Sequence, residues 1–187
     1  MEIMESSTLN EEKLLFSELE KAVVEYRVSC FDEVKRQNLL DVLQNNDCRE
    51  LVAKCVDGDV LSNAFVWACV CDHAEILKAF LNYGMNADIK DNCDDTALIQ
   101  VCIFGHEEAA RLLLSHNSNV DQQTKNSWTA LMCASQEGFK EIVQLLLDQG
   151  ADIDLKNSRG ETAVDLATTT EIKEMIQNHV NTSYTLK

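Results

Sequence analysis

The residues with the most obvious chemical potential form a C-x-C-x-H run at Cys69, Cys71 and His73. Thiolates and imidazoles are zinc ligands, so this run must be weighed as a metal site. A structural zinc site needs four ligands, and no second cysteine pair has the matching spacing. On a helix, Cys69 and Cys71 would also point about 200° apart. We therefore expect ordinary packing at these positions and no bound metal.

A thiol and a base also lie four residues apart, at Cys102 and His106. On one helix such a pair could act as a nucleophile and its base. Gly105 lies between them and is expected to end the helix there. The sequence contains no phosphate-binding glycine loop, no nucleophile elbow and no paired carboxylates in a recognisable frame. We therefore predict that the protein is not an enzyme and uses no cofactor.

The elements that carry these residues are short helices, whose pattern is clearest in residues 124–156. A polar turn leads to Thr129, and the small and apolar residues that follow end at Gly138. A second helical pattern then ends at Gly150, which can close a helix in the left-handed conformation. Isolated helices shorter than about 12–15 residues are marginal in water. The two helices of this unit therefore need neighbouring units to pack against.

The same pattern recurs at a fixed step along the chain. Thr96, Thr129 and Thr162 are 33 residues apart, and Asn63 occupies the equivalent position one step earlier. A small or apolar pair follows each of these four residues. A period of 33 residues with two helices per unit is typical of a stacked solenoid. We therefore predict an all-α protein built from stacked helix-turn-helix units.

The stretches TALMCASQEGFKEIVQLLLDQGADID and TALIQVCIFGHEEAARLLLSHNSNVD resemble the consensus of the ankyrin repeat family. DHAEILKAFLNYGMNAD resembles a diverged copy, and GETAVDLATTTEIKEMI resembles the polar repeat that closes such arrays. The resemblance covers residues 58–179 and implies an ankyrin-repeat solenoid. The sequence departs from the family at its usual proline, replaced by Ala97, Ala130 and Ala163, and at its usual histidine, replaced by Val66, Ile99, Met132 and Asp165.

The residues before the repeats show helical patterns that are out of register with them. Their apolar residues fall into three groups: Leu15, Leu19, Ala22, Val23 and Tyr26; then Phe31, Val34, Leu39, Val42 and Leu43; then Leu51, Val52 and Cys55. The end repeats of a solenoid must be covered. We therefore predict an irregular helical N-terminal cap, with a helix pair that docks a partner or dimerises as the alternative.

The expected organisation follows from these patterns. In chain order, we predict a disordered N-terminus at 1–7, the helical N-terminal cap at 8–57, three ankyrin repeats at 58–90, 91–123 and 124–156, a C-terminal capping repeat at 157–179 and a flexible tail at 180–187.

The charge of the chain narrows the choice of partner. It carries 32 acidic and 16 basic residues, a net charge of −16, without the basic stripe that a nucleic-acid backbone requires. We expect no nucleic-acid or membrane binding and favour basic protein partners, although an acidic surface can also serve solubility alone. With no secretory signal in the sequence, the eight cysteines are expected to be reduced thiols of a cytoplasmic or nuclear protein.

The resemblance also implies where a partner binds. In ankyrin proteins the turn before each first helix and the last two residues of that helix face a concave groove. These positions here are Asp59, Val60, Ser62, Val70, Cys71, Asn92, Cys93, Asp95, Ile103, Phe104, Lys125, Asn126, Trp128, Gln136, Glu137, Ser158, Arg159 and Glu161. Four large apolar residues, Val70, Ile103, Phe104 and Trp128, are expected together at the centre with acidic residues around them. The alternative is that Ile103 and Phe104 belong to the core.

Two classes of function remain open at this point. The first is a non-catalytic binding module, acting as an adaptor, a scaffold or a stoichiometric inhibitor. Its groove would bind a protein or peptide segment with an apolar anchor and basic flanks. The second is an ankyrin fragment of a larger protein with a catalytic, ubiquitin-ligase or sterile-alpha-motif region elsewhere. The oligomeric state and the identity of the partner do not follow from the residues.

Overall fold

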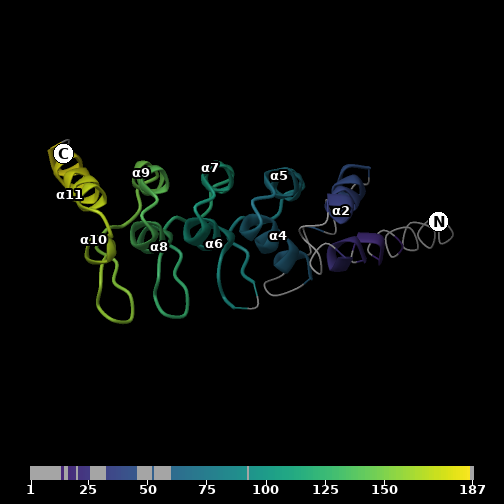
Figure 1. Ribbon diagram of the computed structural model, residues 1–187, viewed down its shortest axis with the longest axis horizontal. Coiled ribbons are helices and arrows are strands. Elements are labelled where there is room, and N and C mark those ends of the chain that lie inside the picture. The colour runs from purple at the N-terminus through teal and green to yellow at the C-terminus, as the bar shows by residue number, and fades with distance from the viewer. Residues whose placement is uncertain are drawn as a thin grey trace, which may run out of the picture.

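The computed structural model describes residues 14, 17–19, 21–25, 33–45, 52, 60–91 and 93–185, and its helices form two rows (Figure 1). The inner row contains α4 (Val60–Val70), α6 (Ala97–Phe104), α8 (Ala130–Glu137) and α10 (Ala163–Leu166). The outer row contains α5 (Ala74–Asn82), α7 (Glu107–Ser115), α9 (Lys140–Asp148) and α11 (Thr170–Thr185), with α2 (Glu33–Asn45) packed beside α5. The prediction of an all-α solenoid of stacked helix pairs is confirmed.

Three of the inner helices begin at a threonine cap. The hydroxyl of Thr96 accepts a hydrogen bond from the backbone N–H of Ile99 at 3.4 Å, and that of Thr129 accepts one from Met132 at 3.3 Å. Thr162 forms a reciprocal capping box with Asp165. These caps satisfy backbone donors that a helix start leaves unpaired. They need only a backbone N–H three residues on, so they persist without the histidines of the family consensus.

The first inner helix begins differently. Because α4 spans Val60–Val70, Asn63 lies inside the helix, so the expected correspondence with the threonine caps is wrong there. The apolar pattern continues upstream of Asn63, where Leu61 is 4% exposed, and this burial holds the segment in the helix. Val60 and Ser62 are consequently helical residues, and Ser62 is fully buried instead of facing a groove.

Two of the inner helices, α6 and α8, end at a glycine. Gly105 and Gly138 have φ of 78° and 86°, the left-handed region that costs other residues strain. Gly105 therefore separates Cys102 from His106 as expected, since α6 stops at Phe104. Asp72 takes the equivalent position after α4 with φ of 55°.

The core lies between the two rows. Phe65, Leu98 and Leu131 occupy equivalent positions of successive inner helices, and none of the three is more than 1% exposed. Cys69 and Cys102 are also fully buried, as expected of small apolar side chains. Burial raises the pKa of both thiols, so neither is a reactive thiolate at neutral pH.

Hydrogen bonds between successive repeats fix the stack. The carboxylate of Asp88 accepts a hydrogen bond from the Ser118 hydroxyl at 2.9 Å and another from the backbone N–H of Asn119 at 2.7 Å. One repeat later, the Asp121 carboxylate accepts one from the backbone N–H of Asp152 at 2.8 Å. Each contact joins residues about one repeat apart, so the turn of one unit sets the position of the next.

The two ends of the chain are described only in part. Leu19, Ala22, Val23, Leu39 and Leu43 are buried as the apolar pattern predicts. Val34 is 77% exposed, so its expected place on the buried face of α2 is wrong: the buried stripe of this helix runs through Leu39, Leu40 and Leu43. Residues 1–7 and most of the third helical pattern lie outside the described residues, where the cap stays a prediction. Helix α11 continues to Thr185, past the boundary expected at residue 179.

Candidate functional site

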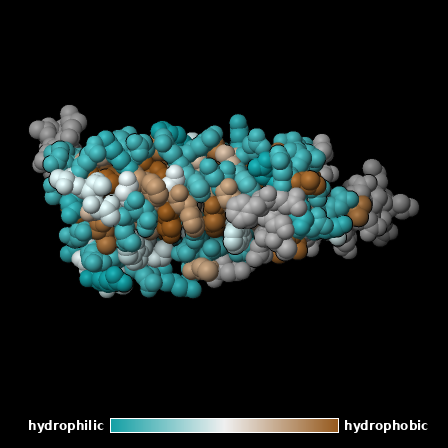
Figure 2. Space-filling model, viewed as in Figure 1, coloured by the Kyte–Doolittle hydropathy of each residue, from teal (hydrophilic) through white to brown (hydrophobic). Residues whose placement is uncertain are grey.

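Exposed apolar side chains mark one side of the inner row. Among the described residues, the large apolar side chains with the greatest exposure are Leu14, Val24, Val34, Trp67, Ile103 and Phe104. Trp67, Ile103 and Phe104 come from α4 and α6 and line two neighbouring hollows. In Figure 2 hydrophobic surface also gathers near the middle of the stack, over α6 to α9. The alternative that Ile103 and Phe104 belong to the core is wrong, because they are 36% and 49% exposed.

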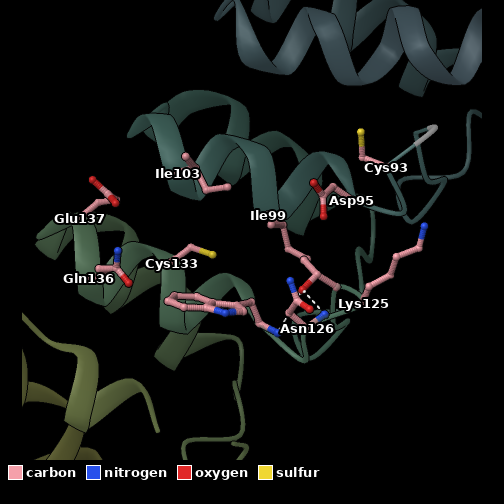
Figure 3. Close-up of a pocket in the computed structure, with 11 residues that line it drawn as sticks. Cys93, Asp95, Ile99, Ile103, Lys125, Asn126, Cys133, Gln136 and Glu137 are labelled. Carbon is pink, nitrogen blue, oxygen red and sulfur yellow. Dashed lines mark hydrogen bonds between the residues drawn. The ribbon is translucent and has the colours of Figure 1, made fainter. Parts of the chain in front are cut away.

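The first hollow lies between α6 and α8 and has a volume of about 420 Å³. Helix α6 contributes Ile99 and Ile103, and α8 contributes residues from the opposite side (Figure 3). The two polar turns supply its end, where Asp95 and Lys125 lie. We call this the α6–α8 hollow, and it is lined by Cys93, Asp95, Ile99, Ile103, Thr124, Lys125, Asn126, Trp128, Cys133, Gln136 and Glu137.

Trp128 is held in this hollow by its own turn. The Thr124 hydroxyl accepts a hydrogen bond from the backbone N–H of Trp128 at 3.2 Å, and the Trp128 carbonyl accepts one from the N–H of Thr124 at 3.0 Å. The Trp128 side chain is partly buried and packs against the core. Ser127 closes the turn with φ of 60°. Trp128 therefore forms a fixed wall of the hollow, whereas Ile103 is its accessible apolar residue.

The charges of the α6–α8 hollow are mostly negative. Asp95 and Glu137 line it, and burial together with the nearby Asp91 and Asp94 charges raises the pKa of Asp95. Lys125 also lines the hollow, but its ammonium forms an ion pair with the Asp94 carboxylate at 3.2 Å. Because this lysine already has an acidic partner, the local field favours a cation in the hollow.

The second hollow lies between α4 and α6, one repeat earlier, with a volume of about 370 Å³. Two aromatic side chains, Trp67 and Phe104, line it, and Asp91 is its acidic residue. The Phe104 ring stacks on His106, with ring centroids 6.0 Å apart, and the His106 Nε2 atom lies 3.0 Å from the Val70 carbonyl. We call this the α4–α6 hollow, and it is lined by Asn63, Val66, Trp67, Val70, Asp91, Cys93, Gln100 and Phe104.

The expected apolar cluster is thus divided. Ile103 and Trp128 line the α6–α8 hollow, whereas Val70 and Phe104 line the α4–α6 hollow. The reason is that consecutive residues on one helix, such as Ile103 and Phe104, point in directions about 100° apart. Cys93 lines both hollows and joins them.

Several predicted groove residues lie elsewhere. Asp59 and Asn92 are outside the described residues, so their role stays a prediction. Cys71, Arg159 and Glu161 line neither hollow. Glu161 instead accepts a hydrogen bond from the Asn157 side chain at 2.9 Å, within the turn before α10. The last turn thus uses its acidic residue to hold its own shape.

Sequence reasoning missed Trp67, although the repeat register could have found it. Trp67, Gln100 and Cys133 are 33 residues apart, and each lines a hollow. This position lies four residues after that of Asn63, Thr96 and Thr129, and three residues before that of Val70, Ile103 and Gln136. On a helix, residues three or four apart share a face. The position therefore belongs to the groove together with the one occupied by Val70 and Ile103.

Burial shifts the pKa values of several cysteine and histidine side chains. Cys69 is buried in the core, while His73 precedes α5 and burial lowers its pKa. Cys133, in the wall of the α6–α8 hollow, has its pKa raised to about 12 by burial and by Asp95 and Glu137. Over the described ranges, no group of three or more His, Cys, Asp or Glu side chains could hold a metal ion. Nor is any helix of the described chain long and apolar enough to cross a membrane.

The repeat pattern of the structure can be compared with known families. A family described as "Ankyrin repeats (3 copies)" matches residues 36–124, 65–157 and 117–178. These overlapping matches extend from α2 to α11 and cover most of the chain. The chain belongs to the ankyrin repeat family. No curated protein matches it.

Family membership agrees with the geometry of the site. Ankyrin repeats are generally protein–protein interaction modules and are typically non-catalytic. The match begins at residue 36, inside the segment expected as an irregular cap, so the ankyrin pattern reaches into α2. The two hollows lie between inner ankyrin helices, where an ankyrin protein can offer different side chains without changing its stack.

Proposed function

We propose that this ankyrin protein is a non-catalytic binding module, an adaptor, scaffold or stoichiometric inhibitor, whose groove binds a segment of a partner protein. The segment carries an apolar anchor with basic residues beside it. The observation that supports this most strongly is Ile103, a partly exposed aliphatic side chain in a hollow whose other lining residues include Asp95 and Glu137. Apolar anchors in water-excluding pockets concentrate the binding energy of protein interfaces.

Electrostatics supports the basic flanks of the proposed segment. The chain has a net charge of −16. The two hollows are lined by the acidic residues Asp91, Asp95 and Glu137 and by a single lysine, Lys125. Such a field speeds the approach of cationic partners and repels nucleic acids and anionic membranes. A partner with Lys or Arg beside its anchor would place these charges near Asp95 and Glu137.

A cytoplasmic or nuclear location is part of the same proposal. The five described cysteines form no disulfide bond, and two of them, Cys69 and Cys102, are fully buried. Free thiols are usual in reducing compartments. An ankyrin module in these compartments would meet segments of intracellular proteins.

Affinity capture from native cell extract tests the proposed groove. The bait is the wild-type chain or the double variant Ile103→Ser, Phe104→Ser, which removes one exposed apolar side chain from each hollow. Trp128 is left intact because it packs against the core. Circular dichroism and thermal unfolding first establish that the variant retains its fold. We expect a discrete set of captured proteins to be lost with this variant.

The matched control is Val34→Ser, which removes an even more exposed apolar side chain from α2, away from the groove. Its captured proteins should be those of the wild type. Retention of the same partners by the groove variant, or their loss with Val34→Ser alone, would contradict the proposal and favour the N-terminal helices as the docking site.

A further inference from the structure

The two hollows are neighbours along one groove. Helix α6 forms a wall of both, with Ile103 in the α6–α8 hollow and Phe104 in the α4–α6 hollow, and Cys93 lines both. The three inner helices pack side by side in chain order. Packed helices lie about 8–10 Å apart, so the apolar centres of the two hollows have a similar separation.

This separation limits the conformation of a segment that fills both hollows. In a polyproline II helix, with three residues per turn and a rise of about 3.1 Å, side chains three positions apart share one side and lie about 9 Å apart. In a β-strand, side chains on one face are about 7 or 14 Å apart. An α-helix reaches about 10 Å only between residues seven positions apart. Polyproline II therefore gives the closest match with the shortest motif.

The polar lining of the hollows favours an extended segment over an α-helix. An α-helix satisfies its own backbone groups, whereas polyproline II has no internal hydrogen bonds. Side-chain amides line both hollows, with Gln100 in the α4–α6 hollow and Asn126 and Gln136 in the α6–α8 hollow. Amides can both donate to carbonyls and accept from N–H groups of a bound backbone.

The aromatic lining points the same way. Trp67 and Phe104 line one hollow and Trp128 the other. Flat aromatic rings between shallow pockets are the surface on which polyproline II segments dock, because their preformed conformation loses little entropy on binding. Each hollow also has an acidic residue, Asp91 in one and Asp95 in the other, to attract basic flanks.

We infer that the groove binds a polyproline II segment of a partner protein with two apolar side chains three positions apart and Lys or Arg at its ends. One apolar side chain fills the α4–α6 hollow and the other fills the α6–α8 hollow. This inference rests on the proposed groove function and specifies the ligand of that groove.

Synthetic peptides can test the spacing directly. The probe is a fluorescently labelled, proline-rich peptide with Lys-Arg at both ends and leucines three positions apart, titrated against the whole chain by anisotropy. Matched peptides move one leucine to a spacing of two, replace one leucine by alanine, or place leucines seven apart in an alanine-rich helix. We expect the first peptide to bind about ten-fold more tightly than each of the others, a difference of about 1.4 kcal/mol.

Variants of the two hollows then assign the leucines. Trp67→Ser should abolish the advantage of one leucine and Ile103→Ser that of the other, while Val34→Ser leaves all affinities unchanged. Equal binding of the shifted-spacing peptide, tighter binding of the helical peptide, or no binding of any peptide would overturn the inference. If another peptide binds more tightly than the predicted one, but Trp67→Ser and Ile103→Ser weaken its binding, the polyproline II inference fails and the groove proposal stands. If neither variant affects any bound peptide, the groove proposal itself fails.

Discussion

The α4–α6 hollow and the α6–α8 hollow are built from the same repeat geometry yet differ in character. Trp67, Val70 and Phe104 make the first mainly apolar, and Asp91 also lines it. The second combines Ile103 and Trp128 with Asp95, Lys125 and Glu137. Equivalent repeat positions therefore carry side chains of different polarity and charge, while the helices around them keep the same arrangement.

The buried and exposed sides of the inner helices carry different kinds of side chain. The buried face of α6 carries Leu98, which is 1% exposed, whereas the groove face carries Ile103 and Phe104. Because the stack depends on the buried face, the groove face can change from one repeat to the next at small cost. A partner that spans both hollows would meet an apolar subsite followed by a charged one.

The largest effect should come from a substitution on the buried side of α6, the helix that lines both hollows. We expect Leu98→Ala to lower the free energy of unfolding by about 2–5 kcal/mol, because it leaves a cavity between the two rows. Ile103→Ala, on the same helix but partly exposed, should cost only roughly 1 kcal/mol. Urea unfolding followed by circular dichroism measures both. Equal losses for the two variants would mean that Ile103 belongs to the core after all.

A comparable effect should follow from a substitution at the end of α6. A Cβ atom added to Gly105 would lie 2.5 Å from the Cε1 atom of Phe139, and the backbone there has φ of 78°. We expect Gly105→Ala to lower stability by about 1–2 kcal/mol through the left-handed strain. The clash with the Phe139 ring should add about 1–3 kcal/mol.

Gly150 provides the matched control for this prediction. It also has a left-handed backbone, with φ of 82°, but an added Cβ would meet nothing within 4 Å. Gly150→Ala should therefore show the strain alone in the same thermal or urea measurement. If Gly105→Ala costs no more than Gly150→Ala, the expected clash with the Phe139 ring does not contribute to the loss of stability.

Much of the fold could be predicted from the sequence because it repeats. Three threonines at a 33-residue step and the glycines after the inner helices identify the units, and in the structure Thr96 and Thr129 cap the helices that follow them. The exception is α4, which passes through the position of Asn63. The repeat alignment places Asn63 at the position of the three threonines, whereas burial of Leu61 before it keeps Asn63 inside the helix.

The groove was harder to predict than the fold. The register placed Ile103 and Phe104 on exposed positions correctly, but it does not say that their side chains point into different hollows. Trp67 was missed because the family pattern singles out the last two residues of each inner helix. Both outcomes depend on side-chain direction, which turns by about 100° from one helical residue to the next. Assigning these directions requires the bounds of each helix, which the structure supplies.

The smallest expected effect concerns Asp95, a charge that distinguishes the α6–α8 hollow. Burial, with the charges of Asp91 and Asp94, raises its pKa above the ordinary value of 3.8, although Lys125 opposes the shift. The folded state then holds the proton more tightly than the unfolded state does. Ionised Asp95 therefore reduces stability as the pH rises from 3.8 through the raised pKa, and the reduction persists at neutral pH.

Asp95→Asn removes this charge while its amide oxygen can still accept the Gln100 hydrogen bond that Asp95 accepts at 3.2 Å. We expect the variant to exceed the wild type in stability by less than about 1 kcal/mol at pH 7, since solvent screens a partly exposed group. Below the ordinary pKa, where Asp95 is protonated in both states, the difference should vanish. Paired thermal unfolding across this pH range measures it, and a pH-independent difference would exclude the Asp95 charge as its cause. The same variant should bind a basic peptide more weakly at neutral pH, because the acidic residue that costs stability is the one proposed to attract the ligand.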